Sequence, residues 1–242
     1  MKLNILNQPD DTTCGPTSLH AVYNFLGYSI DLTELIKEVH SLEDGGTLAV
    51  LLGNDALQRG FSAEIFSYNL KVFDPSWKNL SNNELIEKLN NQLQYKHGKK
   101  FRIVCESYIH FLSIGGKIHF ENLTVDLLRR YFRKNIPILA GLSATYLYEC
   151  TREHALSSGK VIYDDIKGEP SGHFVVLRGM TEDNRIKVAD PYRGNPISND
   201  NYYEINFERL INAIMLGILT YDANLLIISN KENSLAEDSR SK

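Results

Sequence analysis

The chain has 242 residues, of which 43% are hydrophobic and 23% are charged, and its formal net charge is −4 at pH 7. This length and composition predict a single globular domain over residues 1–229, with enough hydrophobic residues to bury a sizeable core. Because there is no basic excess and no polybasic segment, the composition argues against a nucleic-acid partner and against binding to an anionic membrane.

The N-terminal sequence and the cysteines bear on where the protein works. The first ten residues contain no long apolar segment, and no stretch approaches about 18 uninterrupted apolar residues, so neither a signal peptide nor a transmembrane helix is predicted. Cys14, Cys105 and Cys150 are widely spaced and odd in number, which argues against a disulfide framework and a zinc site. We therefore expect a cytoplasmic protein without metal or cofactor; a chain already trimmed of a signal peptide would look the same.

Helical patterns dominate the first part of the chain. The first helix is predicted over 13–26, because Leu19, Val22 and Leu26 recur on one face and Gly27 can end it. Capping-box patterns predict two other helix starts. The remaining predicted helices follow Asp31 (with Glu34 as the capping partner), span 49–58, follow Ser81 (with Glu84 as the capping partner) and span 124–134.

The region 71–119 has a mixed character and is predicted to be an insert or a lid-bearing elaboration. It contains the helix that follows Ser81, a turn at 74–77 and a polar loop over 95–100. A connection of this length is too long for a tight turn, and long elaborations near active sites often control access to them.

Strand patterns follow in the last part of the chain. The predicted strands are 136–142, 174–177, 186–189 and 219–228, the last interrupted by Asp222 and Asn224, and a helix over 206–216 separates the last two. Helices first and strands afterwards indicate an α+β domain. The polar and charged tail over 230–242 is predicted to be disordered.

Cys14 is the candidate nucleophile. It lies between Thr13 and Gly15-Pro16 at the start of the first predicted helix, where the positive end of the helix dipole stabilises a thiolate. An arbitrary free cysteine is more often a small core residue. The helix-start position favours the nucleophile for Cys14, whereas Cys105 and Cys150 keep the core interpretation.

His173 is the candidate base for the thiol. His20 lies on the same helix as Cys14, roughly 9 Å along the axis and on another face, so it cannot reach the sulfur. His40 and His97 lie in polar segments, and His110, His119 and His154 have no identifiable acidic partner. His173 instead opens the apolar strand Phe174 to Leu177.

Asp190 is the candidate residue that orients His173. If the strands on either side of the loop 179–184 form a hairpin centred on that loop, His173 and Asp190 lie directly opposite each other at its open end. Asp190 precedes Pro191, so it also fits a turn residue that ends a strand, and both roles can hold at once.

An oxyanion hole is also required for acyl chemistry. The backbone N–H of Cys14 can supply one donor, and the side-chain amide of Gln8, on the incoming loop, can supply another. An isolated glutamine is weak evidence, and Gln8 gains its weight from the resemblance described next.

The set Gln8, Cys14-Gly15-Pro16, His173 to Leu177 and Val188 to Pro191 with Gly194 resembles the C39-like cysteine peptidases of the papain-like superfamily. The chain order of Gln, Cys, His and Asp is that of the family, and Ile136-Pro137-Ile138 is similar to its central strand. The resemblance covers 3–28 and 136–194 well, 45–74 loosely and the insert hardly at all.

The resemblance implies a papain-like fold, in which an N-terminal helix with Cys14 packs on an antiparallel sheet with His173 and Asp190. It also implies a cysteine hydrolase that cleaves a peptide or amide bond through a thioester acyl-enzyme. Two alternatives stay open: an acyltransferase that uses the same acyl-enzyme, and a binding module without catalysis. The best-known relatives are fused to exporters and trim leader peptides after a double glycine, and this chain lacks an exporter part, so that substrate does not carry over. The sequence indicates no oligomeric state.

Overall fold

A computed structural model describes residues 1–42, 45–156 and 161–231. The predicted tail 230–242 lies almost wholly outside these residues. The helices are α1 (Cys14–Phe25), α2 (Leu32–Glu38), α3 (Ala49–Gln58), α4 (Asn82–Tyr95), α5 (Lys99–Ser113), α6 (Val125–Arg133), α7 (Ala144–Tyr148) and α8 (Phe207–Leu216), with 3₁₀ turns η1 (Pro75–Trp77) and η2 (Gly217–Thr220). The strands are β1 (Ser62–Ser67), β2 (Lys117–His119), β3 (Ile138–Ser143), β4 (Glu153–Ala155), β5 (Val161–Tyr163), β6 (Gly172–Met180), β7 (Ile186–Ala189), β8 (Tyr202–Ile205) and β9 (Asn224–Ser229).

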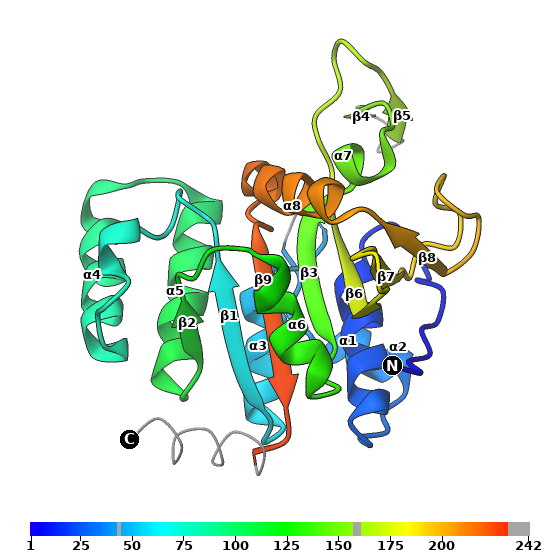
Figure 1. Cartoon of the computed structure of the whole chain (residues 1–242). Coiled ribbons are helices and arrows are strands. Elements are labelled where there is room, and N and C mark those ends of the chain that lie inside the picture. The colour runs from blue at the N-terminus through cyan, green and yellow to red at the C-terminus, as the bar shows by residue number, and fades with distance from the viewer. Residues whose placement is uncertain (43–44, 157–160, 232–242) are drawn as a thin grey trace.

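One seven-stranded sheet organises the molecule, in the order β2-β1-β9-β3-β6-β7-β8. All neighbours are antiparallel except β1 and β2. Helices α1 and α3 pack on one face, and α6 and α8 pack on the other (Figure 1). The predicted α+β class is confirmed. Among the described residues, no helix has the length and apolar character that crossing a bilayer requires.

Both faces of the central strands are buried, which explains why β6 reads as a continuous apolar run. Because side chains alternate along a strand, Phe174 and Val176 join the core beneath α1 and α3, whereas Val175 and Leu177 join the core beneath α6 and α8. The sheet therefore separates two hydrophobic layers. Polar groups can be presented at the ends of its strands.

Helix α1 is seated directly against β6. The Ser18 hydroxyl donates to the carbonyl of Phe174 at 3.2 Å. Gly15 lies so close to its neighbours that an added Cβ would come within 2.3 Å of Thr47 Cγ2 and 3.3 Å of the Phe174 ring. The Gly that follows Cys14 is thus required for close packing of the helix start on the strand that bears His173.

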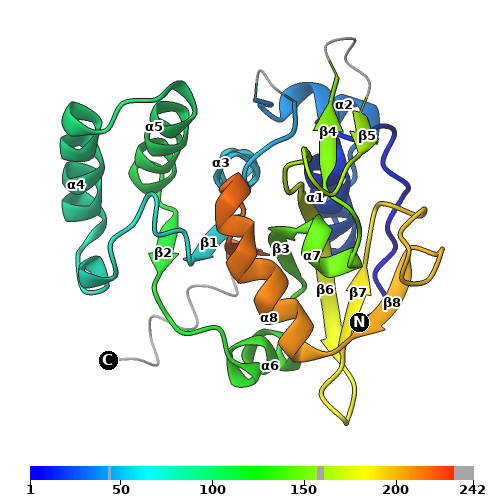
Figure 2. The ribbon, with the colours of Figure 1, turned by 90° about the horizontal axis from the view of Figure 1, so that it is seen from above.

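The region 71–119 forms part of the main core rather than a separate flap. Helix α5 contributes Phe101, Val104, Tyr108 and Phe111 to the same core as α1, and β2 extends the sheet beside β1. In Figures 1 and 2, α4 lies at the opposite end of the molecule from α1 and the β4–β5 hairpin. The structure does not test the predicted lid role, which stays a prediction.

Several elements differ from the sequence predictions. Strand β1, the β4–β5 hairpin, α7 and β8 were not predicted, and α5 occupies residues that were assigned partly to a polar loop. The predicted strand 219–228 begins only at Asn224, because Gly217–Thr220 forms a 3₁₀ turn. By contrast, α3 has the predicted bounds, and Ser81 and Glu84 make both hydrogen bonds of the predicted capping box.

Candidate active site

Cys14 is the first residue of α1 and is 8% exposed. The N-cap residue Thr13 donates its hydroxyl to the carbonyl of Asp10 instead of capping the helix. The helix start therefore has no side-chain cap, and a thiolate at this position benefits from the helix dipole and from the N–H groups of Cys14 and Gly15. The sulfur lies in a cavity of about 280 Å³.

The other two cysteines have surroundings that disfavour a thiolate. Cys105 is fully buried in α5, and burial raises its pKa to about 12. Burial also raises the pKa of Cys150, and the nearby carboxylate of Glu153 adds to this effect. Of the three thiols, only Cys14 combines a helix N-terminus with a neighbouring base.

His173 lines the same cavity as Cys14 and is 6% exposed. Its Nε2 atom is 2.9 Å from Oδ1 of Asp190, so Nδ1 is the ring nitrogen left for Cys14. Burial lowers the pKa of His173, but the negative charges of Asp190 and Cys14, with their hydrogen bonds, outweigh burial and raise the pKa to about 10. The imidazolium form is therefore favoured near neutral pH.

The carboxylate of Asp190 is completely buried and is surrounded by donors. Besides His173, it accepts hydrogen bonds from Tyr148 Oη at 2.8 Å, Tyr203 Oη at 2.6 Å and the backbone N–H of Tyr192 at 2.8 Å. Burial raises the pKa of Asp190, but the charge of His173 and these hydrogen bonds outweigh it, so the pKa is lowered. The same contacts and burial raise the pKa of both tyrosines.

His173 and Asp190 meet, but not in the predicted register. The structure pairs Val176 with Ala189 and Leu177 with Val188, so Asp190 lies past the end of β7 and is not opposite His173. The pairs next to the turn, Gly179 with Lys187 and Met180 with Ile186, already differ from the predicted register, and an irregularity between Leu177 and Gly179 changes the register by one residue. The prediction of direct cross-strand partners was wrong, because it assumed a regular hairpin centred on the loop. The contact is made by side chains at one end of two neighbouring strands, where β6 begins and β7 has just ended.

Gln8 is placed beside His173 in a second cavity of about 200 Å³, and it does not line the cavity that contains Cys14. Its backbone N–H donates to the carbonyl of Pro191 at 2.9 Å, which ties the incoming loop to the segment after Asp190. The side-chain Nε2 donates to the carbonyl of Asp10 at 2.8 Å, and Oε1 is buried without a partner among the described residues. One N–H of the amide remains available for an oxyanion.

The short β4–β5 hairpin contributes to both cavities. Glu153 lines both, and Val161 and Tyr163 line the one that holds Gln8. Of the region 71–119, Lys100 lines the Cys14 cavity. Sequence reasoning missed this hairpin because its strands are only three residues long, and β4 has two polar residues of three.

Three further residues at the site were not foreseen. Tyr148 and Tyr203 fix Asp190, and Asp222 lines the Cys14 cavity. The two tyrosines carry no local motif that relates them to Asp190. Asp222 interrupts an apolar strand pattern in the sequence, but that pattern does not relate it to Cys14.

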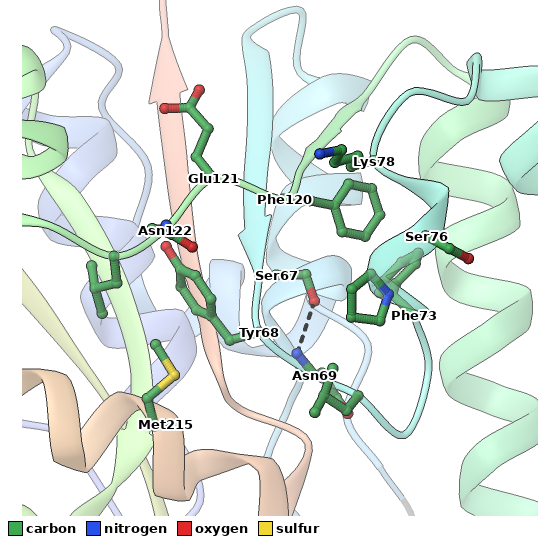
Figure 3. A pocket seen from close by; sticks show the side chains of 13 residues that line it. Ser67, Tyr68, Asn69, Phe73, Ser76, Lys78, Phe120, Glu121, Asn122 and Met215 are labelled. Atoms are coloured by element: carbon green, nitrogen blue, oxygen red, sulfur yellow. Dashed lines mark hydrogen bonds between the residues drawn. The ribbon is translucent and has the colours of Figure 1, made fainter.

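A larger cavity of about 910 Å³ lies elsewhere, between the end of β1, η1, the segment before α6 and the end of α8. Figure 3 shows Tyr68, Phe73, Phe120 and Met215 around it. It shares no lining residue with the cavity that contains Cys14. Although this cavity is larger, none of the candidate catalytic residues lines it, so it is not the candidate active site.

Comparison with known proteins gives the following similarities. The Peptidase_C39 like family model matches residues 2–213. A protein from Bacillus anthracis described as a C39-like peptidase is 13% identical, with 95% of this chain and 96% of that chain covered and a TM-score of 0.47. The peptidase domain of Streptococcus ComA, a bifunctional ABC transporter of a quorum-sensing pathway, is 13% identical, with 95% and 99% covered and a TM-score of 0.45. Among curated proteins there is no match.

Proposed function

Because the chain belongs to the Peptidase_C39 like family, we propose that it is a cysteine peptidase that cleaves a peptide or amide bond with Cys14, His173 and Asp190. The observation that carries this proposal is the buried 2.9 Å contact between His173 and Asp190, made by an imidazole that shares a cavity with the Cys14 thiol. Together the three side chains provide a nucleophile, a base and the group that orients the base.

The proposed reaction begins with the Cys14 thiolate and the His173 imidazolium. The sulfur attacks the carbonyl carbon, and His173 Nδ1–H gives its proton to the departing amine as the C–N bond breaks. The product is a thioester on Cys14. A water molecule then gives a proton to His173 and attacks the thioester, which releases the carboxylic acid and restores the thiolate and the imidazolium.

The remaining groups stabilise charge during these steps. The backbone N–H of Cys14 and the free N–H of Gln8 donate to the oxyanion of the tetrahedral intermediate. Asp190 holds Nε2 of His173, and therefore the ring orientation, throughout the cycle. Among the described residues, Gln8 Nε2 donates only to the Asp10 carbonyl.

We also propose that the protein acts in a reducing compartment such as the cytoplasm. All three cysteines are free thiols, and a nucleophilic thiolate is lost when it is oxidised. Fractionation of the native source, with immunodetection of the chain, tests this proposal, and recovery only from an extracytoplasmic fraction would contradict it.

Two measurements test the activity. Brief treatment with iodoacetamide at pH 6–7, followed by peptide mapping, should label Cys14 ahead of Cys105 and Cys150. A mixture of peptides of varied sequence should then be cleaved by the native protein and not by the alkylated protein or by Cys14→Ser. Selective labelling without cleavage in water, but with product formation when an amine or thiol acceptor is added, would identify an acyltransferase instead. Faster labelling of Cys105 or Cys150 would overturn the assignment.

A further inference from the structure

Asp222 is a buried carboxyl group that the proposed mechanism does not use. It lies between η2 and β9 and is 6% exposed. Its backbone is fixed, because its N–H donates to Gly217 and its carbonyl accepts from the N–H of Asn224. Its side chain lines the cavity that contains Cys14 and His173, and its Oδ1 atom is buried without a hydrogen-bond partner among the described residues.

The position of the carboxyl group relative to His173 is set by a glycine. An added Cβ on Gly172, the residue before His173, would come within 2.3 Å of Asp222 Oδ2 and 2.8 Å of Thr220 Oγ1. Only glycine leaves this space, so the carboxyl group lies directly over the strand residue that precedes the candidate base. Asp222 is therefore part of the wall of the cleft and not a distant structural acid.

An unpartnered buried carboxyl group is costly. Burial raises the pKa of Asp222 to about 7, although a hydrogen bond from Thr220 and the charges of Lys100 and His173 oppose the rise. Lys100 lines the same cavity, but its ammonium lies over the ring of Tyr221, 5.4 Å from the centroid. An acid that burial destabilises, and that keeps one oxygen unpaired, is suited to a partner that arrives with the substrate.

The shape and charge of the cavity indicate the class of that partner. A volume of about 280 Å³ lies near the lower end of the range for ligand pockets, roughly 300–1,000 Å³, and suits one side chain rather than a whole ligand. Asp11 and Glu153 also line it, so the cavity has three carboxyl groups in addition to the Cys14 thiolate, against two cations, Lys100 and the His173 imidazolium. The excess of acidic groups favours a cation.

We propose that Asp222 is a specificity-determining residue, and that its carboxyl group binds a cationic group of the substrate, such as a lysine ammonium or an arginine guanidinium, in the cavity beside Cys14. This inference rests on the proposed function, because it assigns a substrate class to the same site. A charge-assisted hydrogen bond in a buried site gives discrimination of tenfold or more over a neutral group of the same shape.

The test measures how fast Cys14 reacts with three methanethiosulfonates that carry an aminoethyl, a hydroxyethyl or a sulfonatoethyl group. In each case the thiolate forms a disulfide with the reagent and displaces methanesulfinate, so the chemistry is the same and only the charge differs. The intact protein is used, and the modified cysteine is identified by peptide mapping. We expect the ratio of the aminoethyl rate to the hydroxyethyl rate at Cys14 to fall at least tenfold in Asp222→Asn and in Asp222→Ala.

Two control variants separate a local effect from general electrostatics. Glu153→Gln removes another acid from the same cavity and should lower the ratio less than threefold, because Glu153 is only partly buried. Asp126→Asn removes an exposed acid that does not line the cavity and should leave the ratio unchanged. Thermal unfolding of each variant establishes that it is folded before its rates are compared, and using two substitutions at Asp222 covers the case in which one does not fold.

The outcomes distinguish the two proposals. An unchanged ratio in the folded Asp222 variants, with Cys14 still the fastest cysteine, would overturn the role of Asp222 and leave the peptidase proposal intact; the carboxyl group would then have a structural role. If Cys14 reacts no faster than Cys105 and Cys150 with all three reagents, the peptidase proposal fails, and the role of Asp222 fails with it.

Discussion

The imidazole of His173 and the carboxylate of Asp190 are hydrogen bonded at 2.9 Å, although neither residue is the ladder partner of the other. The contact depends on the carboxylate being held from the other side by Tyr148 and Tyr203. The orientation of the candidate base is thus set by a network of side chains from β6, α7, β8 and the segment after β7, and each member of that network can be tested separately.

Replacing His173 should remove the base without removing the thiol. In His173→Ala, the positive charge that favours a Cys14 thiolate is lost, so we expect the rate of iodoacetamide labelling of Cys14 at pH 6–7 to fall about a hundredfold or more. Labelling of all three cysteines in denaturant should be unaffected by the substitution, which controls for sample quality. A labelling rate within threefold of the native protein would show that His173 does not activate the thiol.

Asp190 should tolerate asparagine better than alanine. Asp190→Asn keeps an oxygen that can orient the His173 ring but loses the charge, whereas Asp190→Ala loses both and leaves the tyrosine hydroxyls without an acceptor. We expect peptide cleavage to fall about 10- to 100-fold in Asp190→Asn and further in Asp190→Ala. Equal activities of the two variants would mean that ring orientation contributes nothing measurable.

Tyr148 and Tyr203 should act by positioning Asp190. Each tyrosine-to-phenylalanine change removes one donor to the carboxylate and should cost about 1–3 kcal/mol in the free energy of unfolding. The lowered pKa of Asp190 contributes stability above pH 3.8 that is lost as the pH falls through its folded pKa. The difference in unfolding free energy between native protein and variant should therefore shrink as the pH falls through the folded pKa of Asp190, which lies below 3.8.

The control for the tyrosine variants is Tyr95→Phe, because Tyr95 is 80% exposed and has no contact with Asp190. Its unfolding free energy should equal that of the native protein at every pH. A loss of stability in Tyr203→Phe that stays constant as the pH is lowered until Asp190 is protonated would indicate a packing effect and contradict a role in stabilising the ionised carboxylate.

Asp222 should make stability depend on pH in the opposite sense. A carboxyl group whose pKa rises from 3.8 to about 7 on folding favours the folded state only when protonated, so it destabilises the fold progressively as the pH rises from 4 to 7, by up to about 4 kcal/mol. The charged groups that share its cavity are Asp11, Lys100, Glu153 and His173. Asp222→Asn should therefore gain unfolding free energy relative to the native protein between pH 4 and pH 8, as chemical denaturation can measure. No change in that difference would show that Asp222 ionises normally.

The region 71–119, for which a lid role is predicted, contributes Lys100 to the cavity that contains Cys14. If this region controls access, limited proteolysis of the native protein should cleave it more slowly after Cys14 has been alkylated with a bulky reagent. The comparison with equally treated Cys14→Ser separates occupancy of the cleft from a direct effect on the protease. Identical cleavage of 71–119 in both samples would remove the basis for a lid.

The sequence was most informative where a local pattern sufficed. The helix start at Cys14 and the helix Ala49–Gln58 follow from apolar spacing and from Gly and Pro at the ends, and β6 follows from its uninterrupted apolar run. Strand β1 was not predicted, because its alternation of polar and apolar residues, which includes Ser62 and Glu64, is too short to distinguish from a loop. Helix α5 was not predicted, because Lys99 and Lys100 make its first turn resemble the preceding polar loop.

Contacts between distant segments were beyond a single sequence. The contact between His173 and Asp190 was predicted, but from the wrong register, because Met180 pairs with Ile186 and the turn is therefore not centred on 179–184. Nothing local relates Tyr203 or Asp222 to the site, because each reaches it only through the order of strands in the sheet. Sequence patterns therefore identified the candidate reacting groups. The tertiary structure was needed to identify the residues that orient and surround them.

The place of β9 has a consequence for how the protein is made. It is the last strand of the described chain, yet it lies in the middle of the sheet between β1 and β3. Cys14 is synthesised long before β9. Until β9 has been added, β1 and β3 have no strand between them, and the segment that carries Asp222 is not yet in place. The cleft beside Cys14 can thus be completed only after β9 has been synthesised and has paired with both of its neighbours.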